Sequence, residues 1–173
     1  MNKTDIKSLT HEELQDLLKG MGEKPFRAGQ LYRWMHEKLA ASLDECTNLP
    51  KAFKEKLAEN STYTSLRTVR MLESGIDGTR KYLFGLDDGN VIESVLMKYN
   101  YGNSACISSQ AGCRMGCRFC ASTIGGLNRS LMTSEMLRQI YQIQKITGER
   151  VSNIVVMGTG EPMDNCLLYT SDA

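Results

Sequence analysis

The sequence lacks the features that would place the protein in a membrane, outside the cell or, by charge alone, on a nucleic acid. No segment approaches the roughly 18 consecutive apolar residues of a membrane-spanning helix, and residues 1–13 are too polar for a secretion signal. The net charge is only +1, from 21 Lys and Arg against 20 Asp and Glu, which gives no compositional sign of nucleic-acid binding. We therefore expect a cytoplasmic protein with no membrane association.

Structural disulfides are not expected either. Without an export signal the six cysteines should stay reduced, so their spacing carries more information than their even number. The only two histidines, His11 and His36, lie near the start of the chain. The remaining composition, 41% hydrophobic and 24% charged over 173 residues, is ordinary for one globular domain or two small ones. It excludes a disordered chain, a collagen and a coiled coil.

The charges are unevenly distributed along the chain. Residues 94–134 contain no acid, although they include four of the six cysteines and four cations, namely Lys98, Arg114, Arg118 and Arg129. A segment with cations and no acids favours a negatively charged partner. We therefore expect an anionic ligand to bind there.

The first 60 residues have the pattern of a small helical unit. Thr10-His-Glu-Glu13 has the form of a capping box and predicts a helix to about Lys19. Pro25 suits the first turn of a second helix, predicted over 25–40 from an apolar stripe that reaches Leu39. A third helix is predicted over 50–59.

From residue 63 onward the pattern changes to strands. Alternating β-formers predict an antiparallel meander over residues 66–72, 80–86 and 91–99, with a further short strand over 104–108. A helix is then predicted over residues 133–148, followed by a buried strand at residues 153–157. A strand, a long loop, a helix and a strand form a βαβ unit, from which parallel sheets and barrels are built.

Three cysteines occur within eight residues, in Cys113-Arg-Met-Gly-Cys117-Arg-Phe-Cys120. Thiolates suit both zinc and iron–sulfur clusters, so ligand softness does not choose between them. A structural zinc site requires four ligands, and Cys106 is the only nearby fourth candidate. A cubane cluster held by three cysteines leaves one iron open for a substrate. The spacing favours the cluster, while zinc and unliganded core cysteines stay open.

The triplet, with an aromatic residue before its last cysteine, resembles the signature of the radical S-adenosylmethionine (SAM) superfamily. Further segments are similar to one group within it, the dual-specificity ribosomal and transfer RNA adenine-C2 methyltransferases of the RlmN/Cfr group. These segments are Cys106-Ile-Ser-Ser-Gln-Ala-Gly-Cys113, Gly126-Leu-Asn-Arg129, Met157-Gly-Thr-Gly-Glu-Pro162 and the helical residues 25–34. The similarity covers nearly the whole chain, from about Leu9 to Asn165.

The resemblance implies a cofactor set and its ligands. The thiolates of Cys113, Cys117 and Cys120 would ligate a [4Fe-4S] cluster, and SAM would bind its open iron. Gly160 and Glu161 would bind SAM, with the Glu161 carboxylate accepting hydrogen bonds from the SAM ammonium group. The Gly-x-Gly pattern by itself is a weak signal.

The resemblance also implies two catalytic residues. Glu93 corresponds to the proton acceptor that removes the C2 proton of adenine. Cys106 corresponds to a cysteine that helps to resolve a protein–RNA intermediate through a transient disulfide bond with a methylated cysteine, which belongs to a C-terminal segment absent from this sequence. Without the resemblance, Glu93 would be interpreted as a solvated strand carboxylate and Cys106 as a small core residue.

The expected fold is a truncated α/β fold. It has an RNA-facing helical module at residues 1–60, a β meander at 61–100 and the first part of a radical SAM (βα) barrel at 101–165. Residues 166–173 lack the helical pattern that should follow, and we interpret them as an artefactual tail. An incomplete barrel leaves an open sheet edge, so this fragment alone should be inactive.

The resemblance implies that the full-length parent methylates C2 of a specific adenine in 23S rRNA and in certain tRNAs. We expect a monomer that receives electrons from a flavodoxin-like donor, with Trp34, Arg27 and Arg33 as candidate RNA contacts. Two alternatives stay open. One is a zinc-stabilised, non-catalytic RNA-binding module, and the other is a related enzyme that methylates C8 of the adenine.

Overall fold

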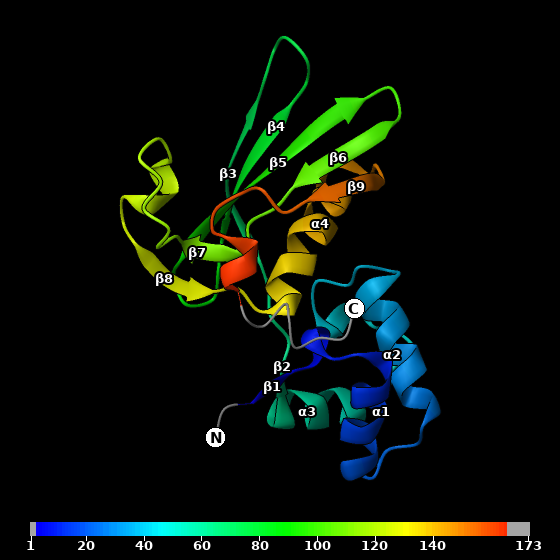
Figure 1. Ribbon diagram of the computed structural model, residues 1–173. Helices are drawn as coiled ribbons and strands as arrows, with labels where there is room; N and C mark the ends of the chain where they lie inside the picture. Colours follow the sequence, from blue (N-terminus) through cyan, green and yellow to red (C-terminus); the bar gives the residue numbers. More distant parts are fainter. Residues whose placement is uncertain (1–2, 166–173) are drawn as a thin grey trace. The chain divides into compact units, whose positions relative to one another are not determined.

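The computed structural model describes residues 3–165 of the chain. The chain divides into two compact units, Met1–Ser65 and Leu66–Ala173, and each has its own hydrophobic core. The first unit is mostly helical and the second is built on a sheet (Figure 1). The mixed α/β class expected from the sequence is confirmed. No helix among residues 3–165 is long and apolar enough to cross a membrane.

The first unit combines helices with one short parallel strand pair. Its described elements are β1 (Thr4–Asp5), η1 (Ile6–Ser8), α1 (His11–Gly20), α2 (Phe26–His36), η2 (Leu43–Glu45), α3 (Lys51–Asn60) and β2 (Ser61–Thr62). The predicted capping box of α1 is confirmed, because the Glu13 N–H donates to Thr10 Oγ1 (3.3 Å) and the Thr10 N–H donates to Glu13 Oε2 (2.8 Å). Buried apolar side chains from all three α-helices meet in the core of this unit.

Helix α2 ends earlier than its apolar spacing predicts. The sequence predicts a helix over 25–40, whereas the structure ends the helix at His36. Leu39 adopts a left-handed backbone conformation (φ 56°), and the Lys38 N–H donates to the Arg33 carbonyl (2.9 Å). Leu39 thus has the conformation that glycine usually provides just after a helix. Because leucine gives no turn signal, the apolar spacing continues past His36, and the sequence predicts a helix that is too long.

The second unit is built on a sheet with the strand order β3-β4-β5-β6-β9 (Figure 1). Its described elements are β3 (Arg67–Glu73), β4 (Arg80–Gly85), β5 (Val91–Tyr99), β6 (Gly102–Cys106), β7 (Gln110–Gly112), η3 (Ala121–Thr123), β8 (Leu127–Ser130), α4 (Thr133–Thr147), β9 (Val151–Val155) and η4 (Pro162–Asp164). Strands β3, β4 and β5 pair antiparallel, as predicted for the meander, and β6 also pairs antiparallel with β5. Strand β9 pairs parallel to β6, which confirms the βαβ unit, and β7 pairs separately with β8.

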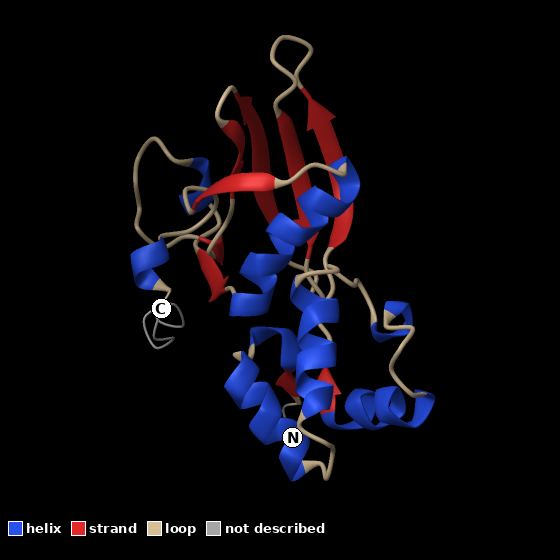
Figure 2. Ribbon diagram, turned by 90° about the vertical axis from the view of Figure 1, so that its right-hand side faces the viewer, coloured by secondary structure: helices blue, strands red, loops and turns tan. Residues whose placement is uncertain are grey.

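Helix α4 covers one face of the five-stranded sheet (Figure 2). Successive residues of β5 point to opposite faces. Ile92 and Leu96 are buried in the same core as Ile140 of α4. Glu93 and Val95 point to the opposite face and are only partly buried. This second face, away from α4, carries the residues of the candidate site.

Strand β9 is more exposed than the sequence predicts. The expected strand at 153–157 is buried, whereas β9 spans Val151–Val155 with Ile154 50% and Val155 38% exposed. Among the described strands, β9 pairs only with β6 and therefore lies at the edge of the sheet. An apolar run has the same appearance in a central strand and in an edge strand, so the sequence could not distinguish them.

Candidate active site

The two catalytic residues expected from the resemblance, Glu93 and Cys106, lie on the same face of the sheet. Val95 pairs with Lys81 of β4 on one side and with Cys106 of β6 on the other, and Cys106 pairs with Val155 of β9. Because paired residues point to the same face, these four side chains form one row across the sheet. Glu93 precedes Val95 by two residues, so it shares this face and is a diagonal neighbour of both Lys81 and Cys106.

The Glu93 side chain is held by an ion pair. Lys81 Nζ lies 2.8 Å from Glu93 Oε1, and the two side chains are 43% and 46% exposed. The backbone of Glu93 is also fixed, because the Ser108 hydroxyl donates to its carbonyl oxygen (2.6 Å). Within residues 3–165 the second carboxylate oxygen makes no hydrogen bond, which leaves it available to accept a proton.

The three clustered cysteines follow β7 on a loop that is closed at its base. The Cys113 N–H donates to the Gly126 carbonyl (2.9 Å), and Gly112 has a φ of 77°. A Cβ at Gly112 would lie 2.0 Å from the Gly126 oxygen, so only glycine fits at this position. Along the loop, Cys113 is buried, Cys117 is exposed and Cys120 is partly buried.

The donor chemistry of this loop fits an iron–sulfur cluster, since thiolates are the ligands that hold such clusters in proteins. The geometry is not that of a site for one metal ion. Within residues 3–165, no three His, Cys, Asp or Glu side chains are grouped so that they could hold a metal ion. Neither a zinc centre made by Cys106 with the three loop cysteines nor a closed set of three cluster ligands is therefore preformed in this part of the chain.

All five cysteines that the structure describes are free thiols. The transient disulfide expected for Cys106 stays a prediction, because its expected partner belongs to a segment that this sequence does not contain. Cys166 and the rest of the expected tail at 166–173 lie outside the described residues.

Gly160 and Glu161, which the resemblance assigns to SAM, follow β9 where the chain runs tightly against residues 107–110. A Cβ on Gly158 would lie 2.8 Å from the backbone of that segment, and one on Gly160 would lie 2.5 Å from the Gln110 Cβ. Gly160 also has a φ of 103°. The two glycines thus allow two segments of the protein to approach each other, whereas the resemblance assigns Gly160 to a ligand. Their role in SAM binding stays a prediction.

Glu161 is held through both its backbone and its side chain. Its N–H donates to Gln110 Oε1 (2.9 Å), and its Oε1 accepts from the Met163 N–H (3.0 Å) at the start of η4. Asp164 accepts from Gln110 Nε2 (3.2 Å) and from Arg114 Nε (2.8 Å), which ties this segment to the cysteine loop. The Arg114 hydrogen bond lowers the pKa of Asp164 below its ordinary value. Among the described residues the second Glu161 oxygen has no hydrogen bond, so it can accept one from an ammonium group.

A buried glutamine of α4 joins the strand ends around the site. Gln139 Oε1 accepts from the Ser94 hydroxyl and the Ser108 N–H (both 2.8 Å), and Gln139 Nε2 donates to the Ser108 carbonyl (2.9 Å). The Ser108 hydroxyl accepts from the Thr159 N–H (2.8 Å) while it donates to the Glu93 carbonyl. Two buried side chains, Gln139 and Ser108, thus link β5, the segment after β6 and the segment after β9.

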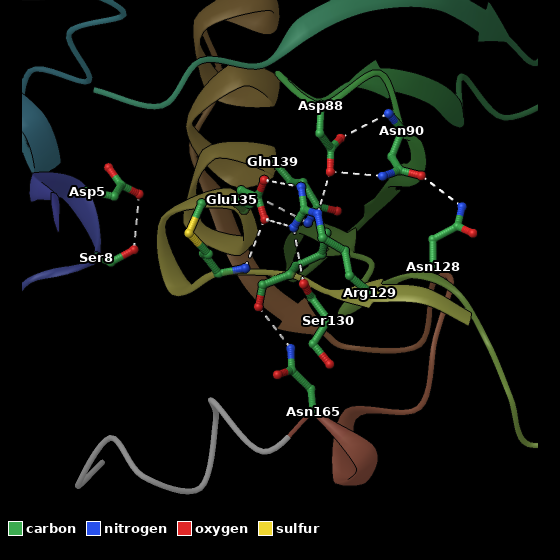
Figure 3. Close-up of polar contacts among 12 residues, drawn as sticks. Asp5, Ser8, Asp88, Asn90, Asn128, Arg129, Ser130, Glu135, Gln139 and Asn165 are labelled. Atoms are coloured by element: carbon green, nitrogen blue, oxygen red, sulfur yellow. Dashed lines mark hydrogen bonds and ion pairs between the residues drawn. The ribbon is translucent and has the colours of Figure 1, made fainter. Parts of the chain in front are cut away.

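The largest ion-pair network of this unit surrounds Arg129 (Figure 3). Its two terminal nitrogens each donate to the Glu135 carboxylate at 2.7 Å, and its Nε pairs with Asp88. Glu135 is only 1% exposed. The Arg129 guanidinium lowers the pKa of Asp88 to about 2, and the two carboxylates, Glu135 first, raise the pKa of Arg129.

This pairing argues against a free cationic surface along the acid-free segment. Arg129 is neutralised by two acids from outside the segment, Lys98 pairs with Glu149 (2.8 Å), and Arg114 is bound to Asp164. Arg118 is exposed and makes no ion pair with residues 3–165. Folding brings acids to three of the four cations, and this cannot be read from the order of charges along the chain.

Three residues of this region, Lys81, Gln139 and Glu135, are not indicated by the sequence motifs. For Gln139 a signal exists, because it lies among Met136 and Ile140 on the apolar face of a helix, where a polar side chain is expected to be buried and hydrogen-bonded. For Lys81 no local signal exists. Its position opposite Val95 depends on the strand register.

Comparison of the fold defines the class of protein. A solved structure described as a radical SAM methyltransferase from Sphaerobacter thermophilus matches with a TM-score of 0.86 at 38% sequence identity. The match covers 94% of this chain and 48% of that one. The chain therefore has the fold of a radical SAM methyltransferase over the part that it covers.

Comparison of the sequence defines the family. The family described as "Ribosomal RNA large subunit methyltransferase N-terminal domain" matches residues 4–62. Two relatives are named "Probable dual-specificity RNA methyltransferase RlmN", one from Lachnospira eligens and one from Lachnoclostridium phytofermentans. Their sequence identities to this chain are 69% and 63%. Each match covers 94% of this chain and 46% of the relative. These matches agree with the RlmN-family resemblance that the motifs indicate, and the chain spans about half the length of the curated relatives it matches.

Proposed function

We propose that this chain is part of a SAM-dependent radical methyltransferase that adds a methyl group to C2 of a specific adenine in 23S rRNA and in certain tRNAs. The observation that carries the proposal is the placement of Glu93 and Cys106 on one face of the sheet. Strand β6 ends at Cys106, and the chain then runs through β7 into the cysteine loop. A proton acceptor and a thiol in one place suit a reaction that replaces a ring proton and releases a covalent adduct.

In this proposal the thiolates of Cys113, Cys117 and Cys120 hold a [4Fe-4S] cluster. Gly160 and Glu161 bind SAM, and the second Glu161 oxygen accepts a hydrogen bond from the SAM ammonium group. When bound, the cluster and SAM supply the radical chemistry that activates an otherwise inert methyl group.

Glu93 and Cys106 carry the remaining chemistry of this chain. Once the new carbon is bonded to C2 of adenine, the carboxylate oxygen of Glu93 that is not engaged by Lys81 accepts the C2 proton, and the electron pair of the C–H bond stays with the ring. The Cys106 thiolate attacks the sulfur of a cysteine of the remaining chain that is bonded to the RNA adduct. A transient S–S bond forms, the C–S bond breaks, and the electron pair of the C–S bond takes up a proton to complete the methyl group.

The proposal assigns a role to each part of the chain. Residues 1–60 form the RNA-facing module, residues 61–100 the meander and residues 101–165 the first part of the barrel. In the helical unit, Trp34 is partly buried with Lys38 Nζ 3.8 Å from its ring centroid, and such aromatic and cationic groups bind unstacked RNA bases. The full-length protein acts as a cytoplasmic monomer with a flavodoxin-like electron donor.

We expect the chain by itself to be inactive. The apolar residues Ile154 and Val155 of edge strand β9 are exposed, and among the described strands β9 has one neighbour only. An open apolar edge of a parallel pair is expected to require further strands or helices as cover.

A chimaera tests the proposed function. Residues 1–165 of this chain would replace the matching part of the Lachnospira eligens relative, and the protein would be reconstituted anaerobically with iron and sulfide. We expect transfer of a methyl group from SAM to adenine C2 in a 23S rRNA fragment, and none with the Cys117→Ser variant. Mass spectrometry and NMR of the isolated nucleoside identify the methylated carbon.

Three outcomes would contradict the proposal. Methylation at C8 would overturn the assigned position on the ring. RNA binding with one zinc per chain and no methylation would support the non-catalytic module. Activity of Cys117→Ser equal to that of the unsubstituted chimaera would overturn the role of the cysteine loop.

A further inference from the structure

We propose that Lys81 is a positioning residue for the proton-accepting carboxylate of Glu93. The inference rests on the proposed function, because it concerns removal of the C2 proton of adenine. Its direct basis is the ion pair between Lys81 Nζ and Glu93 Oε1, which are 2.8 Å apart on the sheet face that also carries Cys106.

The strand register shows how this contact arises. The residue directly opposite Glu93 is Leu83, and Lys81 lies opposite Val95. The Lys81 side chain therefore reaches diagonally along the strand to meet the carboxylate, between neighbours that are apolar. Within residues 3–165, the ammonium group is the only hydrogen-bond donor that contacts the Glu93 carboxylate.

The ion pair is a poor candidate for a stabilising device. Its side chains are 43% and 46% exposed, and ion pairs exposed to this extent contribute little to the stability of a protein. Its effect on geometry is larger, because binding one carboxylate oxygen restricts the rotamer of Glu93. The second oxygen makes no hydrogen bond with residues 3–165, and it belongs to a side chain on the face of the sheet that also carries Cys106.

The step itself is a simple proton transfer. Once the new carbon is bonded to C2 of adenine, the C2–H bond breaks, its proton moves to the free oxygen of Glu93, and its electron pair remains in the ring. Lys81 keeps its own protons and does not contact the reacting atoms. Proton transfer is sensitive to distance and alignment, and a misplacement of 1 Å can lower a rate by about a hundredfold.

The chimaera described above allows a matched test. Lys81→Met removes the ammonium group and keeps an unbranched chain, Lys81→Arg keeps a cationic donor, and Glu73→Gln breaks the neighbouring Arg80–Glu73 ion pair of β3 and β4. We expect Lys81→Met to lower kcat by about tenfold to a hundredfold with an unchanged KM for RNA. Lys81→Arg should recover most of this loss, and Glu73→Gln should have the kcat of the unsubstituted chimaera.

An isotope effect separates positioning of the base from a general structural effect. The substrate is a 23S rRNA fragment with deuterium at C2 of the target adenine. If Lys81 positions the base, its loss makes proton removal more strongly rate-limiting, so the deuterium isotope effect on methylation rises in Lys81→Met. It should stay unchanged in Glu73→Gln. The unfolding midpoint of each variant shows whether the fold is retained.

Failure of the proposed function can be distinguished from failure of the inference about Lys81. If the unsubstituted chimaera does not methylate C2, or if Glu93→Gln is fully active, the proposed function fails and this inference fails with it. If Glu93→Gln is inactive while Lys81→Met keeps its kcat and isotope effect, only the role of Lys81 is overturned. A raised KM for RNA with an unchanged isotope effect would instead make Lys81 an RNA contact and would also overturn it.

Discussion

Gly160 is a residue at which an added methyl group should destabilise the fold. Its φ is 103°, and a Cβ would lie 2.5 Å from the Gln110 Cβ, so Gly160→Ala introduces both backbone strain and a clash. We expect a loss of about 1–3 kcal/mol in the free energy of unfolding, measured by denaturant titration. Gly75→Ala is the control, because Gly75 has an ordinary φ and no atom within 4 Å of its added Cβ. Equal losses in the two variants would contradict the packing argument.

The Asp88 carboxylate predicts a loss of stability in strong acid. Arg129 lowers the pKa of Asp88 from 3.8 to about 2. A group whose pKa is lower in the folded state contributes stability above its unfolded value, and this contribution is lost as the pH falls through the folded value. The free energy of unfolding should therefore fall between about pH 4 and pH 2. Denaturant titrations across this window should give a smaller decrease for Asp88→Asn, and an equal decrease would contradict the prediction.

At the scale of elements, the start of α1 depends on a single hydroxyl group. Thr10 Oγ1 accepts from the Glu13 N–H, which would otherwise lack a partner inside the helix. Thr10→Ala should lower the free energy of unfolding by about 1 kcal/mol. Thr10→Ser should retain most of the stability, because serine caps helices equally well. Denaturant titration followed by circular dichroism measures both, and equal losses would exclude the cap.

The sequence predicts an element well where a side chain marks its ends. The capping box of α1 and Gly148 after α4 are such marks, and both helices have the expected bounds to within about a residue. Helix α2 ends at His36 with no glycine after it to mark the end, and β9 is an edge strand whose exposure depends on its neighbours. Local patterns cannot encode either property.

Only part of the candidate site can be predicted from the sequence. The cysteine spacing indicates a metal or cluster loop by itself, whereas Glu93 and Cys106 stand out only through the family resemblance. Their common face follows from the pairing of β5 with β6, and Lys81 joins them through the pairing of β4 with β5. Gln139 lies in a third element, so its bonds to Ser94 and Ser108 require the packed fold.

At the scale of the whole molecule, the separate cores of the two units predict that residues 1–65 fold alone. His36 gives this fold a specific acid sensitivity, since burial first and Lys7 second lower its pKa from 6.5 to about 4. The unfolded chain therefore binds the proton first, and stability should fall as the pH decreases from 6.5 to about 4. Thermal melts of this fragment at pH 7 and 4.5 should show the decrease, and His36→Gln should reduce it. A melt without a cooperative transition would contradict independent folding.

The hydrogen bond between the Cys113 N–H and the Gly126 carbonyl closes the cysteine loop at its neck. The thiols of Cys117 and Cys120 are therefore carried on the short loop between Cys113 and Gly126. A soft metal captured by any one thiol then meets the other two at the high local concentration that a short tether imposes. Assembly of a metal centre on this loop should therefore be cooperative, and partly loaded chains should be rare.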